Sequence, residues 1–509
     1  MTFAQGCIMA VIILYLAMMI YVGYIYSRKT QNVGDFYLGG RKLGPFVTAM
    51  SAEASDMSSY LLMGLPGLAY LTGLADVGWT AIGLALGTYI NWLIVARRIR
   101  VYSHELKAIT IPDFFSRRFH DEKNLLTCIA AVVIVVFFVP YTASGFAACG
   151  KLFSTLFGVN YMPAMIVSAI VIVTYTSLGG FTAASTTDFI QSIFMTIALI
   201  VILFFGVAQA GGLSAVIENA RSLPGYLSFG QTYDAASGAA APYGFMTVVS
   251  TMAWGLGYFG MPHILLRFMA IEDDRKLALS RRVASVWVLV AMFVAIAIGI
   301  VGLGVVKAGA VTAPEDSETI IITLADLLSS YGFIPAIVAG IVLAGILAST
   351  MSTADSQLLA AASSVSQNLV GEVFGIKVSK TAEMLVARLT VLAIAVVGVV
   401  LARDPNSNVF KIVSFAWAGF GAAFGPVVLL ALFWKRSNKA GALAGMVAGG
   451  AMVFIWKFLV RPIGGAWNIY ELLPAFVVAL AANVIVSLVT PEPDAAVRKE
   501  FDAVMKKCA

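Results

Sequence analysis

Thirteen long apolar runs restrict what this chain can fold into more than any other feature of its sequence. A transmembrane helix needs about 20 apolar residues to cross a hydrocarbon core roughly 30 Å thick. Since backbone groups in lipid must be hydrogen-bonded internally, the runs predict an all-α polytopic membrane protein with about thirteen transmembrane helices. The runs are 6–27, 44–73, 77–96, 125–153, 160–178, 188–211, 244–267, 283–307, 333–361, 383–402, 408–434, 440–460 and 469–490.

Composition and charge agree with this prediction. The chain is 60% hydrophobic and 12% charged, with a mean hydropathy of +0.91, which excludes an ordinary soluble protein. Its four cysteines and three histidines are scattered, so neither a disulfide framework nor a zinc site is expected. Most of the 33 basic residues follow odd-numbered runs, which is the positive-inside pattern and not a nucleic-acid surface. We expect a multi-pass plasma (inner) membrane protein with its N-terminus outside and its C-terminus in the cytoplasm.

Two runs, the second and the seventh, are interrupted by small residues and proline. They lie five runs apart, and an odd offset inverts the membrane direction, so runs 2–6 and 7–11 are predicted to form two inverted five-helix repeats. Broken helices at matching positions of such repeats point to a transporter binding site. We expect one transmembrane transporter domain over 1–509. Its parts are a peripheral first span (6–27), a first repeat (44–211), a second repeat (244–434), two peripheral spans (440–490) and a cytoplasmic tail (491–509).

Two carboxylates, Glu53 and Asp56, lie in the middle of the second run. Counted from Pro45 at 1.5 Å per residue, Asp56 is about 16 Å into the helix, near the bilayer midplane. A carboxylate at that depth is costly and points to a functional site. The small residues around it, with Pro66 and Gly67 beyond, predict a helix that breaks and turns its carbonyls toward a cavity. Such a cavity suits a small cation and a small polar solute.

The ninth run adds three hydroxyl groups, on Ser349, Ser352 and Thr353. Their spacing of i, i+3 and i+4 puts them on one helical face. One interpretation is that they bond to carbonyls of their own helix, as Ser and Thr do in membrane helices. The other is that they join the carbonyls of the broken second run around a hard monovalent cation, which prefers several oxygen ligands.

Several motifs follow one another along the chain. They are Ser55–Ser58 with Leu61–Gly67, Thr176–Phe181, Trp254–Gly260 with Pro262–Ala270, Met351–Thr353 with Gln357–Leu359, and Ala431–Leu432 with Arg436, Gly441 and Ala442. In order and spacing they resemble the solute:sodium symporter family over nearly the whole chain, and within it the bacterial sodium/proline branch. The resemblance implies the inverted-repeat fold and sodium-coupled transport.

The resemblance also implies roles for individual residues. Asp56 would be the carboxylate on which sodium affinity depends. The implied sodium ligands are the carbonyls of Ala54, Met57 and Ser349 and the hydroxyls of Ser352 and Thr353. The implied substrate residues are Ser58, Tyr141, Trp254, Tyr258 and Pro262.

Four positions depart from the sodium/proline pattern, which usually has Gly, Gly, Trp and Gln where this chain has Glu53, Ser59, Tyr60 and Met261. Glu53 matters most, because it adds a second carboxylate one turn from Asp56. Two carboxylates so close repel each other unless a cation or a proton lies between them. Glu53 therefore either changes the ion stoichiometry, the proton sensitivity or the substrate, or it pairs with a neighbouring helix and is structural.

Three further residues have two interpretations each. Asp188 follows Thr186 and Thr187, which is typical of the N-cap of the sixth span, whereas the family resemblance implies a carboxylate on the cytoplasmic sodium exit route. Arg41 is either a positive-inside anchor or part of an intracellular gate. His263 is expected to be a hydrogen-bonded packing residue rather than a proton relay.

Outside the site, the glycines between Gly441 and Gly450 are typical of helices that approach closely. Residues 212–243 predict a long polar loop, and Glu318–Leu328 predicts a short amphipathic surface helix.

These observations predict a symporter that couples sodium to the import of a small amino acid, with L-proline as the first candidate, by alternating access. A family member for another small amino acid or a carboxylate is the second hypothesis, and a transporter-like sensor or channel the third. Sodium is expected as the coupling ion, without an organic cofactor, nucleic acid or obligate protein partner. No nucleophile–base constellation or phosphate loop is present in the sequence, so an enzyme is not expected.

Overall fold

The computed structural model describes residues 2–376, 379–404 and 409–508. Lys377 in a predicted basic loop, Asn408 at the start of the eleventh predicted span and Ala509 at the end of the tail lie outside the described residues.

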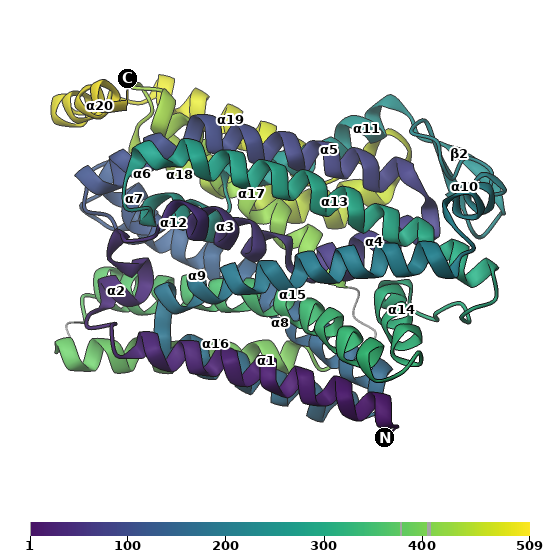
Figure 1. Cartoon of the computed structure of the whole chain (residues 1–509). Coiled ribbons are helices and arrows are strands. Elements are labelled where there is room, and N and C mark those ends of the chain that lie inside the picture. Colours follow the sequence, from purple (N-terminus) through teal and green to yellow (C-terminus); the bar gives the residue numbers. More distant parts are fainter. Residues whose placement is uncertain (1, 377–378, 405–408, 509) are drawn as a thin grey trace.

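Within that part of the chain, ten helical stretches are long and apolar enough to cross a membrane. They run side by side across Figure 1. Their helices are α1 (Phe3–Ser27), α5 (Leu74–Ile90) continuing into α6 (Ala96–Glu105), α8 (Leu125–Phe157), α9 (Tyr161–Gln209), α13 (Leu277–Lys307), α15 (Phe333–Ser363), α16 (Lys380–Leu401), α17 (Val409–Phe433), α18 (Lys439–Ile455) and α19 (Leu472–Val489).

Two of the expected runs are absent from these ten because their helices are broken. The second run forms α3 (Pro45–Ser59), the π-helical segment η2 (Tyr60–Gly64) and α4 (Leu65–Thr72). The seventh forms α11 (Phe245–Met252), the 3-10 segment η4 (Ala253–Phe259) and α12 (Pro262–Ala270).

The fifth and sixth runs both fall within α9, which changes direction at Gly180. The φ angle of Gly180 is +62°, and a β-carbon there would lie 2.7 Å from the carbonyl oxygen of Phe36. Glycine is therefore required on both conformational and steric grounds.

Short elements cover the two ends of the bundle. At the left of Figure 1 lie α2 (Val33–Leu38), η1 (Gly39–Arg41), α7 (Ile111–Arg118) and α20 (Ala495–Cys508). At the right lie α10 (Leu213–Arg221), the antiparallel hairpin of β1 (Gln231–Asp234) and β2 (Ala239–Pro242), and α14 (Ile320–Ser329).

The sequence predicted only a loop over 212–243, whereas the structure forms α10 and the hairpin there. The hydroxyl of Tyr226 donates to the carbonyls of Ala69 and Tyr70, at 2.7 and 2.9 Å, and fastens this segment to α4. A helix near Glu318 is confirmed as α14, but most of it, including Ile320, Ile321 and Ile322, is buried and does not lie on the surface as predicted.

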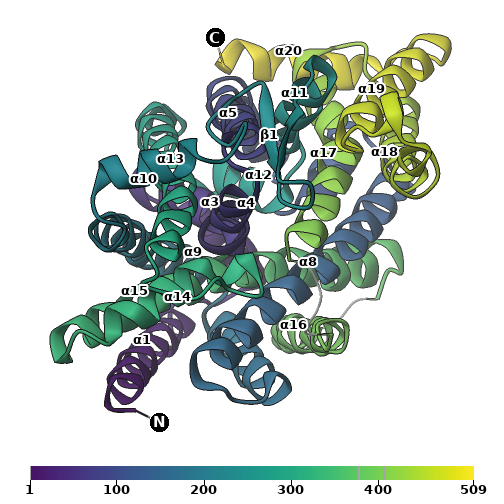
Figure 2. The ribbon, with the colours of Figure 1, turned by 90° about the vertical axis from the view of Figure 1, so that its right-hand side faces the viewer.

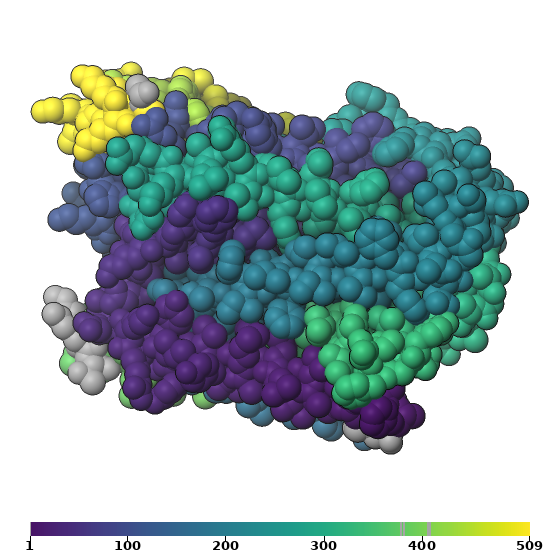
Figure 3. Space-filling model, viewed as in Figure 1, coloured from purple at the N-terminus to yellow at the C-terminus, as the bar shows by residue number. Residues whose placement is uncertain are grey.

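The broken helix α3–α4 lies inside the bundle, where α9, α13 and α15 pack against it. Figure 2 looks along the bundle and shows α3 and α4 near the middle, with other helices around them. α15 packs against α3, α8 and α9, while α1 packs on the outside of α9 and α15. In Figure 3, α1 forms the purple strip along the lower edge of the surface.

The glycines of α18 confirm the expected close approach of helices. A β-carbon on Gly441 would lie 1.9 Å from Ser487 Oγ, and one on Gly445 would lie 2.9 Å from Asn483 Cβ, both on α19. One on Gly449 would lie 2.3 Å from the Ala422 carbonyl oxygen on α17, yet one on Gly450 would meet nothing closer than 4.0 Å. Packing therefore requires glycine at 441, 445 and 449, which are spaced i, i+4, but not at 450.

Gly449 and Gly450 provide a matched pair for measuring this packing. We expect Gly450→Ala to stabilise the protein by about 0.5–1 kcal/mol, because alanine is the better helix former and has room there. Gly449→Ala should destabilise it by about 1–3 kcal/mol, because the added methyl group overpacks the contact with α17. Thermal unfolding of both purified variants in one detergent measures the difference, and equal midpoints would contradict this account of the interface.

Candidate cation and substrate sites

The break in α3 occurs at Ser58, whose φ and ψ angles are 49° and −167°. A non-glycine residue with positive φ is uncommon and is held there by its surroundings. The backbone N–H of Tyr60 turns back to the carbonyl of Met57, and it also lies 3.2 Å from Ser58 Oγ. The expected interruption of the second span is thus present, eight residues before Pro66 in sequence.

The structure brings the predicted cation oxygens of α3 and α15 together. Ser352 Oγ donates to the Ala54 carbonyl oxygen at 2.8 Å, and it lies 3.3 Å from the Ser349 carbonyl oxygen. Thr353 Oγ1 donates to the same Ser349 carbonyl at 3.2 Å, so this hydroxyl bonds within its own helix. All four residues are buried. The Ser352 hydroxyl reaches the neighbouring helix, and the Met57 carbonyl is bonded by Tyr60 within the broken segment.

Both midplane carboxylates keep one oxygen without a partner. Tyr258 donates its hydroxyl to Asp56 Oδ2 at 2.5 Å, and Trp92 donates its indole N–H to Glu53 Oε1 at 2.9 Å. Asp56 Oδ1 and Glu53 Oε2 are buried and have no hydrogen-bond partner among the described residues. Trp92 lies in the π-helical segment η3 (Asn91–Val95) between α5 and α6, so Glu53 does pair with a neighbouring helix.

A small cavity lies beside the break. Its volume is ≈10 Å³, room for about one water molecule. It is lined by Asp56, Met57, Ser58, Tyr60, Leu84, Tyr141, Trp254, Val413 and Trp417. A second cavity of ≈10 Å³ on the other side of Ser58 and Tyr141 reaches Thr353 and Gln357. The two cavities share walls, so the predicted substrate and cation positions are neighbours.

Aromatic rings close one side of the first cavity. The ring centroid of Trp254 lies 5.8 Å from that of Tyr60 and 5.1 Å from that of Tyr470, and both pairs are stacked. Trp417 donates its indole N–H to the Trp254 carbonyl at 2.7 Å. The sequence interpretation did not include Trp417 or Tyr470, because nothing local connects α17 and α19 with the breaks in α3 and η4.

The remaining predicted substrate residues lie beside this cavity and not in its wall. Tyr258 is buried, with its hydroxyl on Asp56 and its ring edge against Trp417, at a centroid distance of 5.1 Å. Pro262 is the first residue of α12 and is also buried. The ring of His263 packs against Phe138, which agrees with a packing role. Its two ring nitrogens are buried and have no hydrogen-bond partner among the described residues, so the expected hydrogen bond is not found.

A buried ion pair lies one helical turn from the predicted cation oxygens. Arg267 Nη2 is 3.1 Å from Asp188 Oδ2, and the two side chains are 1% and 0% exposed. Ser51 on α3 donates to the same Asp188 oxygen at 2.6 Å, and Arg267 also donates to Ser356 on α15. Asp355 accepts from Ser356 at 3.0 Å. Four helices, α3, α9, α12 and α15, therefore meet at one arginine.

Asp188 is not an N-cap, so that interpretation was wrong. It lies within α9, beyond the change of direction at Gly180. The hydroxyl of Thr187 donates to carbonyls of its own helix, at Ala183 and Ala184. Arg267, which the sequence interpretation used only as part of a motif, is the partner of this carboxylate.

Arg41 ties together three segments at one end of the bundle. Its guanidinium donates to the Met269 carbonyl at 2.6 Å, to the Ser103 carbonyl at 3.0 Å and to the Ala108 carbonyl at 2.5 Å. Burial lowers the pKa of Arg41 to about 10, so the side chain stays charged at neutral pH. The contact joins η1 to α6 and α12.

Known proteins are similar to this chain in sequence and in fold. Residues 36–449 match the model of the sodium:solute symporter family. The osmoregulated proline transporter OpuE of Bacillus subtilis is 40% identical over 495 residues, 97% of each chain. A sodium/proline symporter of Staphylococcus aureus is 40% identical over 502 residues, 97% of this chain and 94% of that protein.

Among solved structures, the chain is similar to a Na⁺-coupled sialic acid symporter in a substrate-bound outward-open state. The TM-score is 0.79 at 16% identity, and the superposition covers 97% of this chain and 99% of that one. MhsT in complex with L-phenylalanine gives 0.53 at 14% identity, over 88% and 98%. At these identities the structures establish the fold alone. With the family match over most of its length and two relatives at 40% identity, the chain belongs to the sodium:solute symporter family.

Proposed function

We propose that this chain imports L-proline together with sodium by alternating access. One contact carries the proposal, the 2.8 Å hydrogen bond from Ser352 Oγ to the Ala54 carbonyl oxygen. It brings the hydroxyl face of α15 to the helix that breaks at Ser58, beside a cavity walled by Trp254. The names of the 40% identical relatives support proline as the solute. Another small amino acid or a carboxylate remains the second candidate because Glu53, Tyr60 and Met261 depart from the proline pattern.

Sodium would bind between α3 and α15. The proposed ligands are the carbonyls of Ala54, Met57 and Ser349 and the hydroxyls of Ser352 and Thr353. Neutral oxygens of this kind suit a hard monovalent cation, by analogy with other hard cations. Asp56 would supply the compensating charge through the oxygen that Tyr258 leaves free. Glu53, held by Trp92, would add a second negative charge on the same helix.

The solute would lie against Trp254, between Ser58 and Tyr141. A flat indole offers apolar area to a pyrrolidine ring, and helix ends freed by the breaks can hydrogen-bond a carboxylate. Tyr258 and Pro262 would shape the site from behind. Because a cavity of ≈10 Å³ is smaller than any amino acid, solute entry requires the aromatic rings around Trp254 to move.

The proposed topology is the predicted one. Thirteen crossings result if each half of α9 and each broken pair crosses once, with spans 2–6 and 7–11 as inverted repeats. Basic residues place α2, α7 and α20 in the cytoplasm. The N-terminus is then outside.

Arg267 and Arg41 would close the cytoplasmic side. The Arg267–Asp188 pair lies one turn below the cation oxygens, since Ser51 precedes Ala54 on α3 and Ser356 follows Thr353 on α15. Inward release of sodium must pass this pair, which agrees with a place for Asp188 on the exit route. Opening would also separate Arg41 from the Met269 carbonyl.

Uptake into proteoliposomes tests the function. About 100 mV is worth roughly 2.3 kcal/mol per charge, and a tenfold sodium gradient adds about 1.4. One sodium can thus support roughly several hundredfold accumulation of proline. We expect labelled proline uptake that requires an inward sodium gradient and that Asp56→Ala abolishes without loss of folded protein. If another amino acid competes and proline does not, the second candidate replaces the first.

Ser352→Ala and Thr353→Ala should each raise the half-saturating sodium concentration about tenfold or more, because each removes an oxygen from a cation. Ser349→Ala is the matched control. Its hydroxyl bonds to the Ile346 carbonyl at 2.8 Å and only its carbonyl is a proposed ligand, so sodium affinity should barely change. The measurement is uptake at saturating proline as sodium is varied. Equal effects of all three substitutions would show that the hydroxyls stabilise α15 and do not bind the cation.

Trp254→Ala should weaken proline binding about tenfold or more, because it removes a large apolar wall. Some change in apparent sodium affinity is expected, since coupling between two ligands is reciprocal. Trp467→Ala, at a tryptophan 51% exposed, is the control. Proline binding at saturating sodium is the measurement, and unchanged affinity in Trp254→Ala would place the solute elsewhere.

A further inference from the structure

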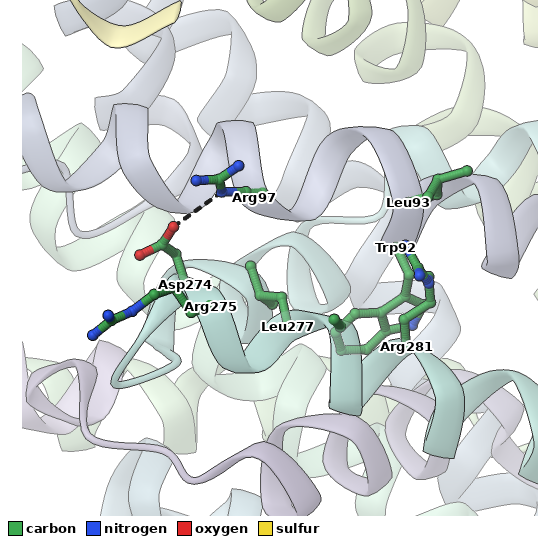
Figure 4. Close-up of a pocket in the computed structure, with 8 residues that line it drawn as sticks. Trp92, Leu93, Arg97, Asp274, Arg275, Leu277 and Arg281 are labelled. Carbon is green, nitrogen blue, oxygen red and sulfur yellow. Dashed lines mark hydrogen bonds and ion pairs between the residues drawn. The ribbon is translucent and has the colours of Figure 1, made fainter. Parts of the chain in front are cut away.

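A groove of ≈350 Å³ opens between η3 and the start of α6 on one side and residues 274–281, at the start of α13, on the other, apart from the cavities beside the break. Figure 4 shows the residues that line it. They are Trp92, Leu93, Arg97, Asp274, Arg275, Leu277, Ala278 and Arg281. Trp92, Leu93 and Leu277 give the groove an apolar floor, and three arginines surround it.

The charge of the lining is positive. The lining includes three arginines and one carboxylate, Asp274, which lies 3.1 Å from Arg97 Nε. Arg97 also donates to the carbonyl of Cys508 on α20. Arg275 is bonded to Asp273 beside the groove, yet its side chain is 83% exposed. Two of the three arginines therefore already have carboxylate partners.

Arg281 differs from the other two. Its guanidinium lies over the ring of Tyr89, with 5.6 Å to the ring centroid. Its Nε atom is buried and has no hydrogen-bond partner in the described part of the chain. Arg281 is therefore the lining arginine without a carboxylate partner among the described residues, and its charge is not neutralised by the protein there.

The groove continues into an apolar surface along α5 and α13. On α5, Leu86 is 50% exposed and Ile90 is 39% exposed. On α13, Val286 and Leu289 are 64% and 61% exposed. In a membrane-spanning chain these side chains face lipid tails. The basic end of the groove is thus at the depth of the headgroups, where exposed aromatic side chains such as Tyr89 gather.

We propose that this groove binds the headgroup of an anionic phospholipid. The phosphate would accept from Arg281, while Arg97 and Arg275 would add positive charge nearby, and the acyl chains would lie along α5 and α13. The positive charge of the groove favours an anionic lipid. Each basic residue near the membrane surface raises the affinity for such a lipid by a factor of about five. The exposed apolar strip selects a lipid over a soluble phosphate.

Native mass spectrometry of the purified full-length protein, with phosphatidylglycerol and phosphatidylcholine in turn, tests the proposal without any transport measurement. We expect retention of phosphatidylglycerol over phosphatidylcholine. The double variant Arg275→Gln/Arg281→Gln should bind phosphatidylglycerol about 25-fold more weakly, by the factor above applied twice. Inorganic phosphate in excess should not displace the lipid, and displacement by phosphate would overturn the assignment to a lipid.

Arg28→Gln/Lys29→Gln is the matched control. It removes two charges from the end of α1, where Arg28 and Lys29 also lie over tyrosine rings. Lipid retention should stay within about twofold of wild type. An equal loss in both double variants would show a general effect of surface charge and overturn the site.

A second variant, Ala278→Trp, tests the site independently in case Arg275→Gln/Arg281→Gln does not fold. Ala278→Trp fills the groove and keeps all three arginines, so it should also lose phosphatidylglycerol. Retention at the wild-type level in a folded Ala278→Trp protein would overturn the proposal.

Discussion

A helix can break inside a bilayer only where other groups hydrogen-bond the backbone that the break frees. Here the break at Ser58 is supported from α15, through the bond from Ser352 to the Ala54 carbonyl. The arrangement of the neighbouring helices depends on this contact, because α15 must stay against α3 while it also packs on α8 and α9. The same hydroxyl that completes the fold would lie at the proposed sodium site.

Much of this could be predicted from the sequence, because the costs that decide it are local. A carboxylate in the middle of an apolar run identified Asp56 and Glu53, and hydroxyl spacing identified Ser352 and Thr353. Small residues identified the interrupted runs. These signals follow from what a bilayer tolerates, and they needed no knowledge of how the helices are arranged.

The rest could not be predicted in this way, because it depends on tertiary contacts. Trp417 reaches Trp254 from α17, and no periodicity connects the two. Asp188 was misjudged since a Thr-Thr-Asp sequence has the composition of a helix start. In the structure the chain turns earlier, at Gly180, and the hydroxyl of Thr187 bonds within α9. The polar residues 186–188 therefore indicate that the chain turns nearby, but they do not show that the turn lies six residues earlier, at Gly180.

The two buried acidic pairs differ in their compensating charge. Near Asp188 and Asp355, Arg267 is a cation fixed to the protein. Near Glu53 and Asp56, the hydrogen bonds come from the neutral side chains of Trp92 and Tyr258, and no described ion pair includes either carboxylate. Unpaired negative charge is costly at that depth. A fixed cation makes a permanent connection between helices, whereas a site that releases its ion must rely on a mobile one. The contrast supports our placement of the transported cation beside Asp56 and of the closing contact at Arg267.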